Sequence, residues 1–186
     1  MRLAMRSGAS FLELVTVLTM MGVILAIAAP RMRVVPRQAD AAAIQLTLAL
    51  EEAQRTALAT QQQVLALLDS GGRRVRLVED RDGDGELTAG ERARWIPLGE
   101  QVRFEDPPVR VDGTMAAGAI VGTGFDTVTA LPAIHFRRDG SASVAAEFYL
   151  TVTGKTVEHR AVVLPRATAH AEWYRYGDGS WKRGAP

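Results

Sequence analysis

Apolar residues are concentrated near the start of this 186-residue chain. An uncharged run occupies residues 14–30, and it begins at Phe11 if one acidic residue, Glu13, is included. A helix of about 20 apolar residues is long enough to cross a bilayer, so the run predicts a transmembrane helix over residues 9–30. Arginines lie on both sides of the run, and their number does not decide its orientation.

A second, amphipathic stretch follows. Residues 39–68 are rich in Ala, Leu, Gln and Glu, which favour a helix, and apolar residues recur on one face at steps of three and four. Together the two stretches predict a helix from about Ser10 to Leu68, roughly 90 Å long. Pro30 and Pro36 should bend or loosen it. The apolar face comprises Leu46, Leu50, Ala53, Ala57, Val64 and Leu68.

From residue 71 onward, short alternating runs are separated by Gly, Pro and Asp, which predicts strands joined by turns. A long helix followed by strands indicates an α+β fold. Residues 31–70 should form the helical part that packs on an antiparallel sheet, and residues 71–186 the β-rich head domain. Residues 111–127 predict a long irregular loop. The predicted strands are 73–78, 93–98, 102–105, 133–137, 143–151, 156–164 and 171–176, with turns at 139–140, 153–154 and 178–179.

Composition narrows the function classes. The chain has 22 Lys+Arg and 21 Asp+Glu, so no overall basic field attracts nucleic acid. It has no cysteine, which excludes disulfides, thiol catalysis and cysteine-ligated zinc. Its three histidines show no metal spacing, and it contains neither a glycine-rich phosphate loop nor a G-x-S-x-G motif. The sequence therefore carries no enzyme signature.

Glu13 distinguishes the possible roles of the apolar run. A secretory signal cut near Ala26 or Ala28, or a plain membrane anchor, would explain the hydrophobicity. Neither explains a carboxylate that costs about 2.5–3.5 kcal/mol to insert among lipids. Cleavage after Gly8 would make Ala9 the new N-terminus, about one helical turn from Glu13. The ammonium of one subunit could then neutralise Glu13 of another and dock the two helices.

Residues 8–30, GASFLELVTVLTMMGVILAIAAP, resemble the leader junction and N-terminal helix of type IV pilins and type II secretion pseudopilins. The resemblance consists of a short basic leader ending in Gly8, a glutamate five residues later and an apolar helix with Pro30 near its end. It implies cleavage after Gly8 by a prepilin peptidase and N-methylation of Ala9. Ala9 stands where the family usually has phenylalanine. Residues 1–8 would be the leader peptide.

Residues 134–184 resemble, more loosely, the C-terminal part of the GspH/FimT minor pseudopilin family, with an aromatic strand and an Asp-Gly turn before the last strands. The resemblance implies a pilin-like fold and a structural role in a periplasmic filament of a type II secretion system or type IV pilus. It also implies an inner-membrane, single-pass location with the head in the periplasm. The implied partners are other pseudopilins or pilins, the prepilin peptidase and the inner-membrane assembly platform.

The acidic segment 80–91 matches the spacing of a calcium-binding loop. Asp80, Asp82 and Asp84 alternate, and Glu91 occupies the twelfth position. The flanking residues predict strands and not the helices of an EF-hand, so a solvated hairpin tip is the competing interpretation. Ca2+ is therefore a candidate ligand, and a secreted calcium-binding module released after Ala28 is a distant alternative function.

The C-terminal residues interleave aromatic and basic side chains. Such a pattern can bind single-stranded nucleic acid by stacking and phosphate contacts. The nearest alternative function is thus a type IV minor pilin that binds DNA for uptake through Arg175, Lys182 and Arg183. The competing interpretation is a last strand whose aromatic residues cover the core and whose charges are solvated.

Overall fold

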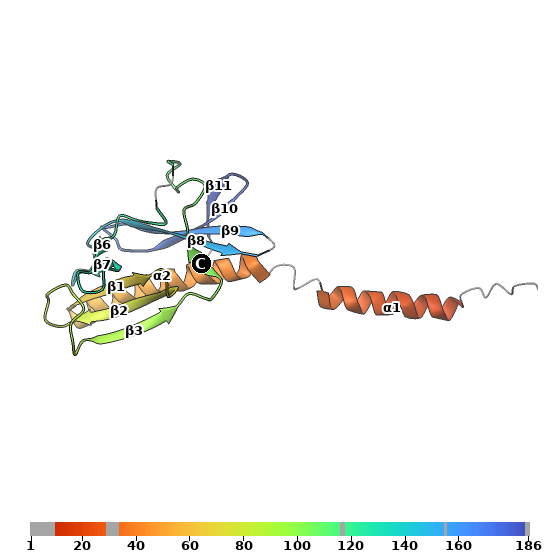
Figure 1. Ribbon diagram of the computed structural model, residues 1–186, viewed down its shortest axis with the longest axis horizontal. Helices are drawn as coiled ribbons and strands as arrows, with labels where there is room; N and C mark the ends of the chain where they lie inside the picture. Colours follow the sequence, from red (N-terminus) through yellow and green to blue (C-terminus); the bar gives the residue numbers. More distant parts are fainter. Residues whose placement is uncertain (1–9, 29–33, 116–117, 155, 185–186) are drawn as a thin grey trace, which may run out of the picture. The chain divides into compact units, whose positions relative to one another are not determined.

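The computed structural model describes residues 10–28, 34–115, 118–154 and 156–184 (Figure 1). The chain divides into two compact units, residues 1–34 and residues 35–186. The first unit contains helix α1, Phe11–Ala28. The second contains helix α2, which is assigned from Val34 to Thr60, and all the described strands.

Helix α1 is apolar on every side. All of its side chains from residue 11 to residue 24 are exposed. The hydroxyls of Thr16 and Thr19 donate to the carbonyls of Glu13 and Val15 at 2.8 and 3.0 Å. Both hydroxyls therefore find their hydrogen-bond acceptors within the preceding turn of the helix. Among the described residues, no helix combines the length and the apolar character needed to span a membrane.

The predicted helix from Ser10 to Leu68 is wrong after Thr60, where α2 ends and the chain continues as a strand. Pro36 lies in the first turn of α2, where its missing N–H removes no helical hydrogen bond. Helix α2 ends at Thr60 because Gln61 adopts a left-handed φ of 58°. Pro30 lies outside the described residues.

The segment after Gln61 is strand β1, Gln63–Asp69, and not the end of a helix. Its five central residues are all buried, which means that both faces of the strand are covered. A continuous apolar run suits a central strand as well as a helix, and periodicity alone does not separate the two. Tertiary burial therefore overrides the helical preference of VLALL.

The described strands pair in antiparallel fashion in two sheets. Sheet order is β3-β2-β1-β7-β6 in one and β11-β10-β9-β8-β4 in the other, with β5 pairing to β8. The remaining strands are β2 (Arg74–Asp80), β3 (Arg92–Pro97), β4 (Val102–Phe104), β5 (Ile120–Val121), β6 (Gly124–Phe125), β7 (Pro132–Phe136), β8 (Ala146–Thr153), β9 (Val157–Leu164), β10 (Glu172–Gly177) and β11 (Ser180–Arg183).

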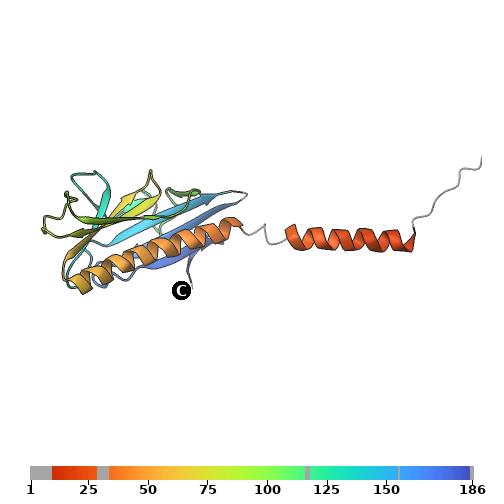
Figure 2. The same cartoon turned by 90° about the horizontal axis from the view of Figure 1, so that it is seen from below.

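Helix α2 lies along one side of the sheets (Figure 2) and buries four of the six residues of the predicted apolar face; the other two, Val64 and Leu68, lie on β1. Leu46, Leu50, Ala53 and Ala57 are each fully buried. They pack with inward residues of both sheets in one core. The α+β arrangement of a long helix on antiparallel sheets is thus confirmed.

All seven predicted strands correspond to described strands, whereas β1, β5, β6 and β11 were not predicted. Strand β11 follows the predicted turn at Asp178-Gly179, where both residues have positive φ, 52° and 75°, as a tight hairpin turn requires. Strands β5 and β6 have two residues each and lie in the segment predicted as an irregular loop. Strands this short leave no alternating pattern to detect.

Candidate functional site

The first candidate site is the beginning of α1. Glu13 lies in the first turn of the helix, and its N–H donates to the carbonyl of Ser10 at 2.9 Å. A carboxylate at this end is favoured by the helix dipole. The other first-turn side chains, including Phe11, Leu12 and Leu14, are exposed and apolar. Gly8 and Ala9, the predicted processing residues, lie outside the described part of the chain.

The second candidate site is the acidic loop between β2 and β3. Carboxylate oxygens of Asp80, Asp82 and Asp84 lie within 4.8 Å of one another. Asp80 is 2% exposed, and its two oxygens accept the N–H groups of Gly83 and Gly85 at 2.6 and 3.0 Å. The three aspartates predicted as calcium ligands are therefore brought together, and the most buried one also shapes the loop.

Glu91, the fourth predicted ligand, closes the loop through hydrogen bonds and is not one of the three clustered carboxylates. Its oxygens accept the N–H groups of Arg81 and Thr88 at 3.1 and 2.9 Å. The N–H of Asp84, with help from the Thr88 hydroxyl, lowers the pKa of Asp82. The loop therefore brings several carboxylate oxygens together, and a hard cation such as Ca2+ prefers oxygen ligands of this kind.

The acidic loop also covers the outer face of the first sheet. Leu87 and Leu131 pack on a small buried cluster formed by Leu65, Leu67, Val78 and Ala133. The carboxylate of Asp126, which is 1% exposed, accepts the N–H of Leu87 at 3.3 Å and that of Thr129 at 2.6 Å. Sequence analysis missed Asp126, because nothing in the Gly-rich segment around it marks a buried acceptor.

Replacing Asp80 with alanine should lower the free energy of unfolding by about 1–3 kcal/mol, because it removes a buried carboxylate that accepts the N–H groups of Gly83 and Gly85. Urea denaturation in the presence of EDTA measures this loss without any metal contribution. The matched variant Asp82→Ala, at an exposed position, should change the stability little. Equal losses in the two variants would contradict the structural role assigned to Asp80.

The same pair of variants tests the calcium hypothesis. If the three aspartates hold the ion, adding Ca2+ should raise the Tm of the wild-type chain. Asp82→Ala should remove that rise because it deletes one of the clustered carboxylates. A Tm that does not respond to Ca2+ would reject the hypothesis and leave the loop as a hydrogen-bonded hairpin tip.

The third candidate site is the C-terminal hairpin, formed by β10 and β11. Each of its predicted nucleic-acid contacts is already paired with a carboxylate. The pairs are Arg175–Asp40 at 2.6 Å, Lys182–Asp178 at 2.9 Å and Arg183–Glu172 at 2.7 Å. Phosphate binding would have to compete with these partners, so the hairpin gives the DNA-binding alternative no specific support.

The aromatic residues of the hairpin are used within the fold. Trp173 is 8% exposed and belongs to the main core. The indole N–H of Trp181 donates to the carbonyl of Val109 at 2.9 Å. The ring of Trp181 packs against Tyr149 and Tyr176, with centroid distances of 5.8 and 5.1 Å. These contacts fit a last hairpin whose aromatic rings cover the sheet.

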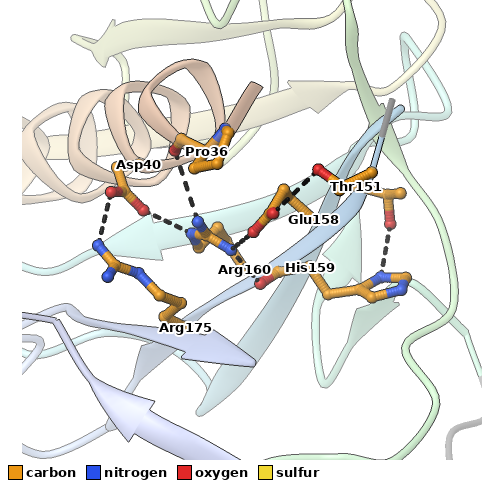
Figure 3. Close-up of polar contacts among 8 residues, drawn as sticks. Pro36, Asp40, Thr151, Glu158, His159, Arg160 and Arg175 are labelled. Atoms are coloured by element: carbon orange, nitrogen blue, oxygen red, sulfur yellow. Dashed lines mark hydrogen bonds and ion pairs between the residues drawn. The ribbon is translucent and has the colours of Figure 1, made fainter. Parts of the chain in front are cut away.

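A fourth cluster, which sequence analysis missed, surrounds Arg160 on β9 (Figure 3). The side chain of Arg160 is completely buried. It donates to Asp40 of α2 at 2.6 Å, to Glu158 at 3.1 Å, and to the carbonyls of His159 and Pro36 at 2.8 and 3.5 Å. The other oxygen of Asp40 accepts Arg175 at 2.6 Å. One carboxylate therefore fixes the start of α2 to β9 and β10.

Comparison with known proteins gives no match to any family model, curated protein or solved structure. The functional assignment therefore depends on the residues and contacts described above.

His159, next to the Arg160 cluster, should make the head less stable in acid. Burial lowers the pKa of His159; the nearby carboxylates of Glu105 and Glu158 oppose this effect, and Arg160 adds to it. The unfolded chain keeps the ordinary histidine pKa of about 6.5. As the pH falls, the unfolded chain therefore binds a proton at His159 at a higher pH than the folded chain does. The free energy of unfolding consequently decreases as the pH falls below about 6.5.

Urea denaturation at pH 7.5 and at pH 5 checks this prediction. The free energy of unfolding should fall between the two, and His159→Gln should reduce the fall. Glutamine keeps a polar group near the Thr151 hydroxyl, which lies 3.1 Å from Nδ1 of His159, but it does not titrate. An identical fall in the variant would show that other groups cause the acid sensitivity.

Proposed function

We propose that this protein is a minor pseudopilin, a structural subunit that assembles into a periplasmic filament of a type II secretion system or type IV pilus. The observation that carries the proposal is α1. It is apolar around its whole described surface, and it has a single carboxylate, Glu13, in its first turn. A helix of this kind requires partners of its own kind or lipid, because soluble helices are apolar on one face only.

The head is consistent with such a subunit. The main hydrophobic core lies between α2 and the two sheets, and its described members all belong to residues 39–173. Burying α1 among other subunits would therefore leave the core of the head intact. The chain supplies both parts that a filament subunit needs: an apolar helix for association and a separately packed head.

The proposal includes processing, partners and location. A prepilin peptidase would cut after Gly8 and free Ala9, which would then be N-methylated. Glu13 would guide docking to other pseudopilins or pilins at the inner-membrane assembly platform. The head would lie in the periplasm. The protein would act by assembly and not as an enzyme.

Mass spectrometry of the mature N-terminus is the most direct test of the proposal. A mature chain that begins with methylated Ala9 supports it. A chain that begins at Ala29 indicates a cleaved secretory signal, and an intact N-terminus indicates a plain anchor; either result rejects the proposal. Expression without prepilin peptidase is the control, since it should leave residues 1–8 attached.

A further inference from the structure

Strand β3 forms a free edge of the first sheet (Figure 1). It pairs with β2 and with no other described strand. Five of its six residues are exposed. An edge strand presents unpaired N–H and C=O groups along its outer side, and these can pair with another chain.

Two hollows lie between this edge and α2. Their volumes are about 420 and 240 Å3, and both are lined by Glu52 and Arg94. These two residues form an ion pair. Leu77 lines the first hollow, and Ile96 lines the second. Alternate side chains of a strand added to β3 would point toward α2, where the hollows offer them space.

The side of β3 that faces α2 carries two arginines, of which Arg94 is paired with Glu52. The side chains of Arg92 and Arg94 are 77% and 58% exposed. The carboxylate of Glu79 lies 3.8 Å from the guanidinium group of Arg92 and 3.9 Å from that of Arg81. One carboxylate is therefore shared by two guanidinium groups, and both ion pairs are long. An incoming carboxylate would find positive charge that Glu79 does not neutralise.

The opposite side of β3 carries a second cationic group. The guanidinium groups of Arg74 and Arg76 lie 3.9 and 5.2 Å from the ring centroid of Trp95. Arg74 pairs with Asp69 at 2.9 Å. Arg76 makes no ion pair with a described residue, and its buried Nε has no hydrogen-bond partner. The positive charge of Arg76 is therefore not neutralised by a described carboxylate, and a carboxylate from a partner could pair with it.

We infer that the free edge of β3 binds an extended, acidic segment of another polypeptide by strand addition. The segment's backbone pairs with β3, and its carboxylates alternately face Arg92 and Arg94 on one side and Arg76 on the other. A second copy of this chain is a poorer partner, because two paired β3 strands would bring their arginines together. The inference is independent of the proposed function.

Fluorescence anisotropy of a labelled peptide tests the inference. The probe is a short peptide in which pairs of glutamates alternate with pairs of valines, so that an extended strand has carboxylates on both faces; it is added to the full chain in detergent. Two comparison peptides separate the contributions. In one, lysine replaces glutamate and reverses the charge. In the other, proline replaces valine and keeps the charge but removes backbone donors.

The expected result is binding of the glutamate–valine peptide alone. The double variant Arg92→Glu/Arg94→Glu should weaken that binding at least about tenfold. The matched variant Arg37→Glu/Arg138→Glu makes the same charge change at exposed positions outside β3 and should preserve it. Equal binding of the proline peptide, equal loss in both variants, or no binding by the wild-type chain would overturn the inference. Pairing of two β3 strands would also overturn it; this would be detected as a dimer mass after the mass of bound detergent is subtracted.

Discussion

Replacing Asp40 with alanine should lower the free energy of unfolding of the head by about 3 kcal/mol. The reason is the environment of its partner, because the side chain of Arg160 is completely buried. Without Asp40, this guanidinium loses its shortest contact, at 2.6 Å, and keeps only Glu158 and two backbone carbonyls. Urea denaturation at pH 7.5 measures the loss.

Arg175→Ala is the matched control. Arg175 contacts the same carboxylate at the same distance of 2.6 Å, but its side chain is 52% exposed. Water replaces an exposed partner easily, so this variant should lose about 1 kcal/mol or less. If Asp40→Ala and Arg175→Ala lower the free energy of unfolding equally, burial of Arg160 does not determine the energetics of the cluster. Arg160→Met combined with Asp40→Ala should recover part of the loss, because the uncompensated buried charge is then absent.

The Asp40–Arg160 contact also shows why sequence analysis located some sites and missed others. These two residues are 120 positions apart, and no spacing rule connects them. Asp80, Asp82 and Asp84, by contrast, lie within one loop, and their alternation was enough to predict that they cluster. Local motifs can be found from local spacing, whereas contacts between distant elements depend on the topology.

The same distinction applies to the fold. Alternation of apolar and polar residues located strands such as β2, and steps of three and four located the buried face of α2. The boundary between α2 and β1 could not be predicted in this way. Strand β1 is buried on both faces, so it has no alternation. Its residues also have high helix propensity, which favoured the wrong extension of the helix.

The C-terminal hairpin shows a further limit. Composition alone made Arg175, Lys182 and Arg183 candidates for phosphate binding. Their neutralising partners come from α2, the hairpin turn and β10. The charge available to a ligand therefore depends on pairing in the folded chain, which a count of basic residues does not reveal.

Glu13→Ala should abolish incorporation of the protein into filaments, provided that α1 associates with other subunits through this carboxylate. The substitution removes the single charge of α1 and leaves a more apolar helix with a better helix former at that position. It changes no residue of the head core, so the head should remain folded. Immunoblotting of sheared filament fractions measures incorporation, and urea denaturation checks the fold.

The value of this variant is that the rival explanations predict the opposite outcome. If α1 were only a hydrophobic anchor, removing Glu13 would strengthen its membrane insertion by about 2.5–3.5 kcal/mol. The wild-type chain and Glu13→Ala would then not differ in the amount found in filaments. If the carboxylate is a docking group, membrane retention is kept while incorporation is lost. Thr16→Ala is the control, since Thr16 satisfies its hydroxyl within the helix and should still be incorporated. Normal incorporation of Glu13→Ala would therefore remove the assembly role from Glu13 and, with it, the main support for a pseudopilin.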